Sequence, residues 1–300
     1  MDAVAALQRF FTKEEDVAAV YLYGSFASSE TFSDTDLEIA ILFSDRLTED
    51  DIGQFLERLP ASNPLGDSPG ILMPSSLNTH ILPVIYETLE AGTVITDNDP
   101  PARAAFAAGA AARLEDERAA LLGEAKEAIM QARTLGMIVV PSDGIVLPQP
   151  PRPLDPIRIG WRLARILASA AVIDSLTRSG ESPDHNPELL GQLVGWFSNA
   201  VGAATGIAKA ALTMFEMPRP PRRWQVFIPL ADAGLVPMEL ALQMAAHVEA
   251  RWQLITGSGM TSPERMVATI RASLTPVIAF ARLAAWYTHL PGGRPDQHVH

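Results

Sequence analysis

Two aspartates separated by one residue, Asp34 and Asp36, stand directly before an apolar alternation that begins at Leu37. Alternate side chains of a strand point to the same face, so both carboxylates would share one face, with their Cα atoms ~6.5 to 7 Å apart. Carboxylates at this spacing suit hard cations, and two Mg²⁺ ions ~3.5 to 4 Å apart are the arrangement used in two-metal phosphoryl transfer. The pair therefore predicts a magnesium site for a triphosphate.

A Gly-Ser turn precedes the aspartates and follows the apolar run 17–23. Gly24 has no Cβ, so its backbone can approach a phosphate, and Ser25 offers a hydroxyl and an N–H near the start of a helix, where anions are favoured. We predict that Gly24 and Ser25 bind the nucleotide, while Asp34 and Asp36 hold the metal and act in catalysis. Taken singly, each motif is more common as an ordinary turn or a solvated strand edge.

Hydrophobic periodicity predicts the elements that position these residues. Strands are expected over 17–23, 37–43, 71–73, where Pro74 would end the strand, and 93–96 at an edge. Helices are expected over 3–11, 49–59 behind a Thr48 cap, 79–91 and 100–136. The first 136 residues are thus predicted to form a domain with a small mixed sheet and helices. With the helical second half, the fold class of the chain is α+β.

The order strand, Gly-Ser, polar spacer, Ser-Asp-x-Asp-Leu, strand resembles the signature of the DNA polymerase β-like nucleotidyltransferase superfamily. It is most similar to the minimal nucleotidyltransferases (MNT, MntA-like antitoxins). The resemblance implies Mg²⁺ as cofactor, ATP or another NTP as substrate, and transfer of a nucleotidyl group to a protein or other hydroxyl acceptor. Eight residues separate the Gly-Ser from Asp34, where the family usually has ten, so the connecting helix should be shorter.

Enzymes of this superfamily normally carry a third carboxylate on the third strand, where it completes the metal cage or acts as base. Minimal nucleotidyltransferases follow this strand with a Leu-Asn pair, which Leu77-Asn78 resembles. Counting back from that pair places Met73 or Leu72 where the family has the third Asp. The resemblance therefore implies that the third carboxylate is missing from its usual place.

Two other carboxylates could replace the missing group. Asp67 lies in the loop before the third strand, and Glu38 lies on the same strand face as Asp36, one step deeper. Loss of a general base usually costs ~10²- to 10⁴-fold in rate. We therefore expect nucleotide binding with weak transfer activity, and turnover stays open.

Composition and charge exclude several other functions. The chain has no Cys, which rules out a disulfide framework, a thiolate metal site and a thiol nucleophile. Residues 1–100 hold 18 Asp and Glu against 4 Lys and Arg, a balance that repels nucleic acid phosphates. Neither a leader pattern nor a window of about 20 uninterrupted apolar residues is visible, so we expect a cytoplasmic protein without a membrane partner.

The second half of the chain reads as a separate, all-helical domain. Residues 137–156 hold six prolines and are predicted to be a linker, 157–290 a helical bundle and 291–300 a tail. Its helices are expected over 157–178, 187–215, 224–232, 237–255 and 263–289. By pattern alone the bundle carries no chemistry, and it offers a surface for a homodimer or a helical partner.

Four stretches of this half, 217–220, 226–236, 249–252 and 262–267, resemble the HEPN-type HepT proteins, the usual partners of minimal nucleotidyltransferases in toxin–antitoxin pairs. HepT toxins are ribonucleases whose motif is Arg, usually Asn, then His and Tyr. Arg251 matches the Arg, whereas Trp252, Thr256 and Ser258 occupy the other places, and His247 is expected to be structural. The resemblance implies a fused antitoxin and toxin. The alternative is a degenerate remnant that acts as a nucleotide-binding or helical interaction protein.

Overall fold

The structure is a computed structural model that describes residues 3–23, 37–65, 72–134, 154–178, 186–218, 220, 222–256 and 262–288. The chain forms two compact units, Met1–Ala119 and Ala120–His300. This division falls inside a helix rather than in the proline-rich stretch 137–156, of which 137–153 lie outside the described residues. The predicted tail, 291–300, lies outside them as well.

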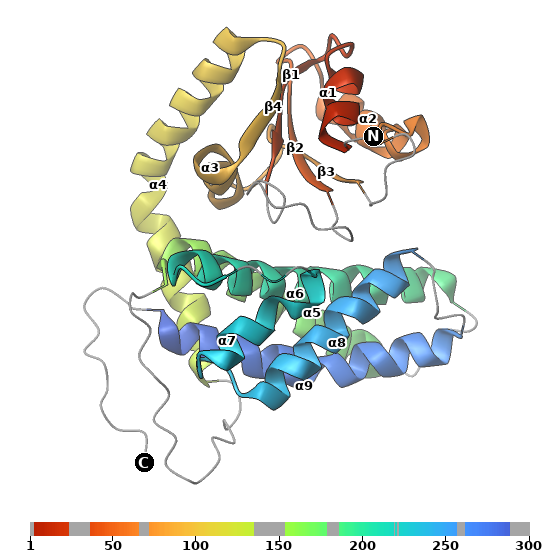
Figure 1. Cartoon of the computed structure of the whole chain (residues 1–300), viewed down its shortest axis with the longest axis vertical. Coiled ribbons are helices and arrows are strands. Elements are labelled where there is room, and N and C mark those ends of the chain that lie inside the picture. The colour runs from red at the N-terminus through yellow and green to blue at the C-terminus, as the bar shows by residue number, and fades with distance from the viewer. Residues whose placement is uncertain are drawn as a thin grey trace. The chain divides into compact units, whose positions relative to one another are not determined.

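The first unit is built on a four-stranded sheet (Figure 1). Its strands are β1 (Val17–Leu22), β2 (Leu37–Phe43), β3 (Leu72–Ser76) and β4 (Thr93–Asp97), in the order β3-β2-β1-β4. Strand β1 runs antiparallel to both β2 and β4, while β2 and β3 are parallel. The small mixed sheet predicted from the sequence is confirmed.

Helices cover both faces of this sheet (Figure 1). Helices α1 (Ala3–Phe11) and α2 (Glu49–Arg58) pack on the face that carries Leu37, Ile39, Ile41 and Phe43. Helix α3 (Leu82–Ala91) and the first turns of α4 (Pro100–Thr134) pack on the other face. Because β2 has neighbours on both edges and cover on both faces, six of its seven residues are buried.

Strand β3 does not end at Pro74, as the sequence analysis predicted, but continues to Ser76. The backbone N–H of Leu77 donates to the Ile41 carbonyl at 2.8 Å. Since N–H directions alternate along a strand, the Pro74 nitrogen faces away from β2, toward the open edge of the sheet. The missing N–H of proline therefore costs no bond to β2.

Single residues also determine where two of the helices begin. Helix α2 begins behind the predicted Thr48 cap, where the side chains of Thr48 and Asp51 each accept the other's backbone N–H. Helix α3 begins at Leu82, not at residue 79, because Pro83 is tolerated only in the first turn.

The second unit is helical, as predicted (Figure 1). Its helices are α5 (Pro156–Arg178), α6 (Pro187–Met214), α7 (Ile228–Asp232), α8 (Met238–Thr256) and α9 (Pro263–Tyr287), with a 3₁₀ turn at Arg223–Phe227. The last turns of α4 join the same core through Ala128, Ile129 and Ala132. The aromatic rings of Phe197, Phe227 and Phe280 are buried in it. The boundaries of α5, α6, α8 and α9 lie within two residues of the sequence expectation, whereas the helix expected over 224–232 is divided into the 3₁₀ turn and α7.

Among the described residues, α9 alone has the length and hydropathy of a helix that could cross a membrane. Core helices of water-soluble proteins meet the same two criteria. Helix α9 buries Ile270, Val277, Phe280 and Leu283 in the bundle core.

The Leu77-Asn78 pair has a structural role at the end of the sheet. Leu77 is fully buried between the sheet and its helical cover. The Asn78 side chain accepts the Phe43 N–H at 2.8 Å and donates to the Phe43 carbonyl at 3.2 Å. Asn78 therefore pairs with the last residue of β2 as a further strand residue would.

We expect Asn78→Ala to lower the free energy of unfolding of the first unit by ~1–3 kcal/mol, because both Phe43 backbone groups lose their partner. Urea denaturation measures the change. The neighbouring exposed Thr79→Ala is the control and should have little effect. Equal stability of the Asn78→Ala protein and the wild type would refute this role.

Candidate functional site

The candidate site lies at one end of the sheet, where β1 finishes and the other three strands begin. This line of strand ends is here called the sheet edge. Leu22 pairs with Thr93, and Leu37 pairs with Leu72. The Tyr23 N–H donates to the Glu38 carbonyl at 3.0 Å, so β1 and β2 stay paired up to this edge. The chain therefore enters and leaves residues 24–36 at neighbouring positions on the sheet.

The four residues predicted to form the site are Gly24, Ser25, Asp34 and Asp36, and all of them lie outside the described residues. Asp67, one of the two candidate replacements for the third carboxylate, lies outside them too. The structure does describe the residues on either side of these motifs. The Tyr23 N–H is bonded to β2, and Leu37 is the first residue of that strand.

Strand register distinguishes the two candidates for the third-carboxylate position. Leu72 packs into the core on the α1 and α2 side, together with Leu37 and Ile39. Met73, the next residue, therefore lies on the opposite face, and its register partner on β2 is Glu38. Of Leu72 and Met73, it is therefore Met73 that shares a face with Glu38, which is half-buried.

Two hydroxyl groups lie on this same face. Ser75 donates its Oγ proton to the Ile39 carbonyl at 3.2 Å, and the Tyr23 hydroxyl lies 3.3 Å from Ser75 Oγ. Tyr23 is at the end of β1 and Ser75 is on β3, so the tyrosine side chain crosses β2. The contact ties the β1 end of the candidate site to β3, and the sequence alone gave no sign of it.

Within the described part of the chain, no group of three or more His, Asp and Glu side chains is close enough together to hold a metal ion. At the sheet edge, the described strand ends supply one carboxylate, that of Glu38. A metal ion there would depend on Asp34 and Asp36, whose oxygen donors are of the type that Mg²⁺ prefers.

Of the residues compared with the HepT motif in the sequence analysis, Arg251, Trp252 and Thr256 lie on α8. Arg251 is half-buried and donates its Nε–H to the carbonyl of Ser198 on α6 at 3.2 Å. Thr256, at the motif's His position, is the last residue of α8, and Ser258 lies outside the described residues. His247 lies one turn before Arg251, on the same side of the helix.

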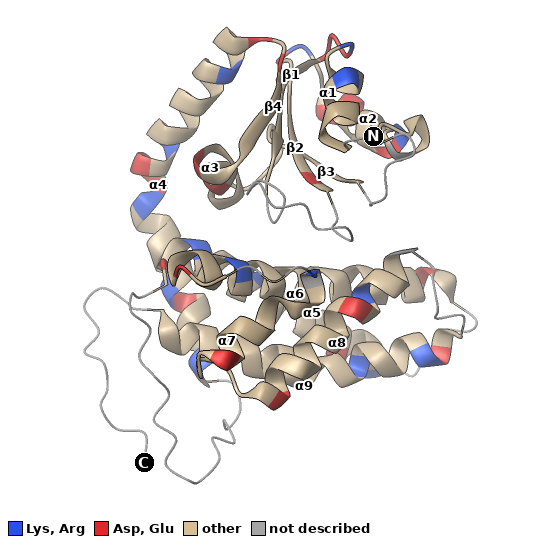
Figure 2. Cartoon of the chain, in the orientation of Figure 1, with Lys and Arg blue, Asp and Glu red and all other residues tan. Residues whose placement is uncertain are grey.

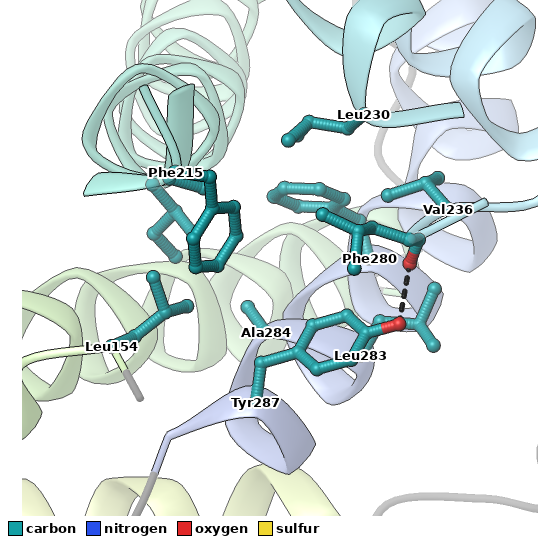
Figure 3. A pocket seen from close by; sticks show the side chains of 11 residues that line it. Leu154, Phe215, Leu230, Val236, Phe280, Leu283, Ala284 and Tyr287 are labelled. Atoms are coloured by element: carbon teal, nitrogen blue, oxygen red, sulfur yellow. Dashed lines mark hydrogen bonds between the residues drawn. The ribbon is translucent and has the colours of Figure 1, made fainter. Parts of the chain in front are cut away.

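A cavity of about 20 Å³ in the bundle core is not a ligand site (Figure 3). Its lining is made by apolar side chains and by Tyr287, whose hydroxyl donates to the Leu235 carbonyl at 2.7 Å. Such a volume holds about one water molecule. Burial raises the pKa of Tyr287 to about 12, so this group stays a neutral donor. A larger hollow of about 240 Å³ is lined by residues of α5, α6 and α9.

Comparison with known proteins identifies the first unit. A family model described as "Polymerase beta, Nucleotidyltransferase" matches residues 5–101, about a third of the chain. The match begins within α1, ends at the start of α4, and includes the segment 24–36 and Met73. The first unit therefore contains a nucleotidyltransferase domain of the polymerase β type. Neither the curated proteins nor the solved structures provide a match to this chain.

His247 provides a pH test of the bundle. Burial lowers the pKa of His247 below the ordinary value of 6.5. The unfolded chain therefore takes up the proton first as the pH falls. The stability that this residue contributes is present above pH 6.5 and is lost as the pH falls toward its folded-state pKa. We expect His247→Gln to lessen the loss of bundle stability between pH 7 and pH 5, measured by urea unfolding. Identical pH profiles for the two proteins would contradict this expectation.

Proposed function

We propose that the chain binds Mg·NTP, with ATP as the first candidate, at the sheet edge and transfers a nucleotidyl group to a hydroxyl of a protein or another acceptor. The observation that carries the proposal is the family match over residues 5–101, since nucleotidyl transfer is the reaction of that family. The pairing of β1 with β2 supports it, because the residues that flank 24–36 in the chain, Tyr23 and Leu37, lie at neighbouring positions on the sheet.

In this proposal, Gly24 and Ser25 donate backbone and hydroxyl hydrogens to phosphate oxygens, and Asp34 and Asp36 hold the metal. Mg²⁺ bound there would neutralise negative charge on the triphosphate. The acidic balance of residues 1–100 opposes entry of a bare triphosphate. The nucleotide is therefore expected to arrive with its cation.

Glu38 is the better candidate to replace the third carboxylate. It pairs in register with Met73, and neighbouring strands are ~4.8 Å apart, so a glutamate side chain can reach the space beside Met73. Glu38 also lies on the face to which Asp36 would belong if β2 continued one residue toward its start. Its half-buried carboxylate could accept the proton of the attacking hydroxyl.

For the second unit we propose a HEPN-like bundle, related to the HepT partners of toxin–antitoxin systems, without ribonuclease activity. The side chain of Arg251 is engaged with the Ser198 carbonyl, and Thr256 cannot act as the acid or base that His would supply. In this reading the protein is cytoplasmic, with the bundle as its surface for a protein acceptor, a helical partner or a second copy.

One observation favours a second function, nucleotide binding without turnover. The residue of β3 that pairs in register with Glu38 is Met73, whose side chain can neither bind Mg²⁺ nor act as a general base. A domain with this change could serve as a nucleotide sensor that acts through its helical bundle.

The first test is nucleotide binding. ATP with Mg²⁺ should raise the melting temperature of the full chain, because a ligand that binds the folded state stabilises it by mass action. The double variant Asp34→Ala, Asp36→Ala should lose this shift. Asp45→Ala with Asp50→Ala, which removes two exposed carboxylates elsewhere in the same unit, should keep it. A full shift in the Asp34/Asp36 variant would overturn the site assignment.

The second test is turnover. Incubation with ATP radiolabelled at the α-phosphate and with cell lysate should give slow labelling, and Met73→Asp should increase the rate. The control is Met73→Asn, which introduces a side chain of the same size as aspartate but without its negative charge. If Glu38 is the base, Glu38→Gln should lower the residual rate by ~10²- to 10⁴-fold. Fast labelling that survives Glu38→Gln would show that nucleotidyl transfer does not depend on the Glu38 carboxylate.

A further inference from the structure

The face of the sheet that packs under α3 and the first turns of α4 is arranged in rows that run across the strands. In the row nearest the sheet edge, Tyr23 lies opposite Glu38 of β2, which pairs with Met73 of β3. In the next row, Ala40 of β2 pairs with Ser75 of β3. Glu38 is the only charged residue in β1, β2 and β3, all of which the structure describes (Figure 2).

The Tyr23 side chain connects these two rows. Its hydroxyl lies 3.3 Å from Ser75 Oγ, although Ser75 belongs to the second strand over and to the deeper row. Neighbouring strands are ~4.8 Å apart and alternate residues of a strand ~7 Å apart, so the Cα atoms of the pair are separated by ~12 Å. A contact over this distance requires the tyrosine side chain to lie extended along the sheet, across β2.

Ala40 gives the tyrosine ring the space that it needs. On this face, β2 presents Glu38, Ala40 and Leu42. The diagonal from Tyr23 to Ser75 crosses the strand beside Ala40, which is fully buried and belongs to the same apolar cluster as Tyr23. Because the side chain of alanine is a single methyl group, the ring can cross β2 at this point.

The two hydroxyl groups form a short chain that ends on the backbone of β2. Ser75 donates its proton to the Ile39 carbonyl at 3.2 Å, so its oxygen is left to accept and the Tyr23 hydroxyl is the donor. Consecutive hydrogen bonds of this kind polarise and strengthen one another. The Tyr23 N–H donates to the Glu38 carbonyl at 3.0 Å. Tyr23 is therefore held at both its main chain and its side chain.

The residue that follows Tyr23 in the chain is Gly24. Glycine has more conformational freedom than any other residue, so ordering it costs the most backbone entropy. A fixed residue directly before it restricts the directions in which the chain can leave β1. Such restriction lowers the entropy cost of binding, because a preorganised site has less freedom to lose when its ligand arrives.

We propose that Tyr23 is a positioning residue for the nucleotide: its hydrogen bond to Ser75 holds the start of the segment 24–36 so that Gly24 and Ser25 can bind the phosphate chain. Tyr23 acts through the backbone that it fixes and does not touch the nucleotide. This role rests on the proposed function, because phosphate binding by Gly24 and Ser25 is itself a proposal. It adds the Ser75 hydroxyl of β3 to the groups that determine nucleotide affinity at the sheet edge.

Calorimetric titration with Mg·ATP tests this role in the full chain. We expect Tyr23→Phe and Ser75→Ala each to raise the Kd about 3- to 10-fold, the range expected when one ordinary hydrogen bond is lost. Both variants break the same hydrogen bond, so the double variant should show about the same increase as either single one. The free energy of unfolding without nucleotide is measured with urea on the same proteins.

The matched control is Tyr21→Phe. Tyr21 lies on the same face of β1, one row deeper, and its hydroxyl is hydrogen-bonded to Arg103. Loss of this hydroxyl should lower the free energy of unfolding and leave the Kd for Mg·ATP within twofold. A side chain with a purely structural role changes stability alone. The comparison of Tyr23→Phe with Tyr21→Phe therefore separates positioning of the nucleotide site from a general loosening of the sheet.

Three results would overturn the proposal. One is an unchanged Kd in both Tyr23→Phe and Ser75→Ala, which would leave the nucleotide site itself in place. Another is an equal increase of the Kd in Tyr21→Phe. The third is an increase in the double variant that equals the product of the two single increases, since the two hydroxyl groups would then act separately. Absence of Mg·ATP binding by the wild type is a different failure, because it would overturn the proposed function and this role together.

Discussion

The pairing of β2 on both of its edges is the constraint on which the first unit depends. A strand with two partners and two covered faces has no solvent-exposed side, so its register cannot slip without moving apolar side chains out of their layer. This fixed register sets Glu38 opposite Met73 and holds Tyr23 and Leu37 at neighbouring positions. The candidate site thus takes its frame from main-chain hydrogen bonds, while the predicted ligands come from the connection between two strands.

Much of the fold could be predicted from the sequence because its signals are local. Alternation identified β2, and the Thr48 cap and its Asp51 partner identified the start of α2. The errors arose where a local rule depends on tertiary context. Pro74 was expected to end β3, yet an edge strand has one side on which a proline nitrogen needs no partner. Deciding whether Leu72 or Met73 stands at the third-carboxylate position likewise required the register between β2 and β3.

The surroundings of Arg162 show what helical periodicity does not reveal. The apolar positions of α5 predicted a core helix, and Arg162 lies among them as a charged residue at a buried position. Its side chain lies against Gly206, 44 residues away, which no local pattern connects to it. Glycine also makes room for a neighbouring helix elsewhere in the bundle. A Cβ on Gly160 would lie 2.4 Å from the Cβ of Ala125, so glycine lets α5 pack closely against the last turns of α4.

Helix α4 has one further consequence. Its first turns contribute Phe106 and Ala110 to the core of the first unit, and its last turns contribute Ala128 and Ile129 to the core of the second. Between them, most side chains of residues 111–124 are exposed, so this stretch depends on the helix propensity of its Ala, Leu, Glu and Arg residues and on the Arg113–Glu117 pair. Weak packing in the middle of a shared helix uncouples the two cores. Heating should then unfold the chain in two calorimetric transitions rather than as one cooperative unit.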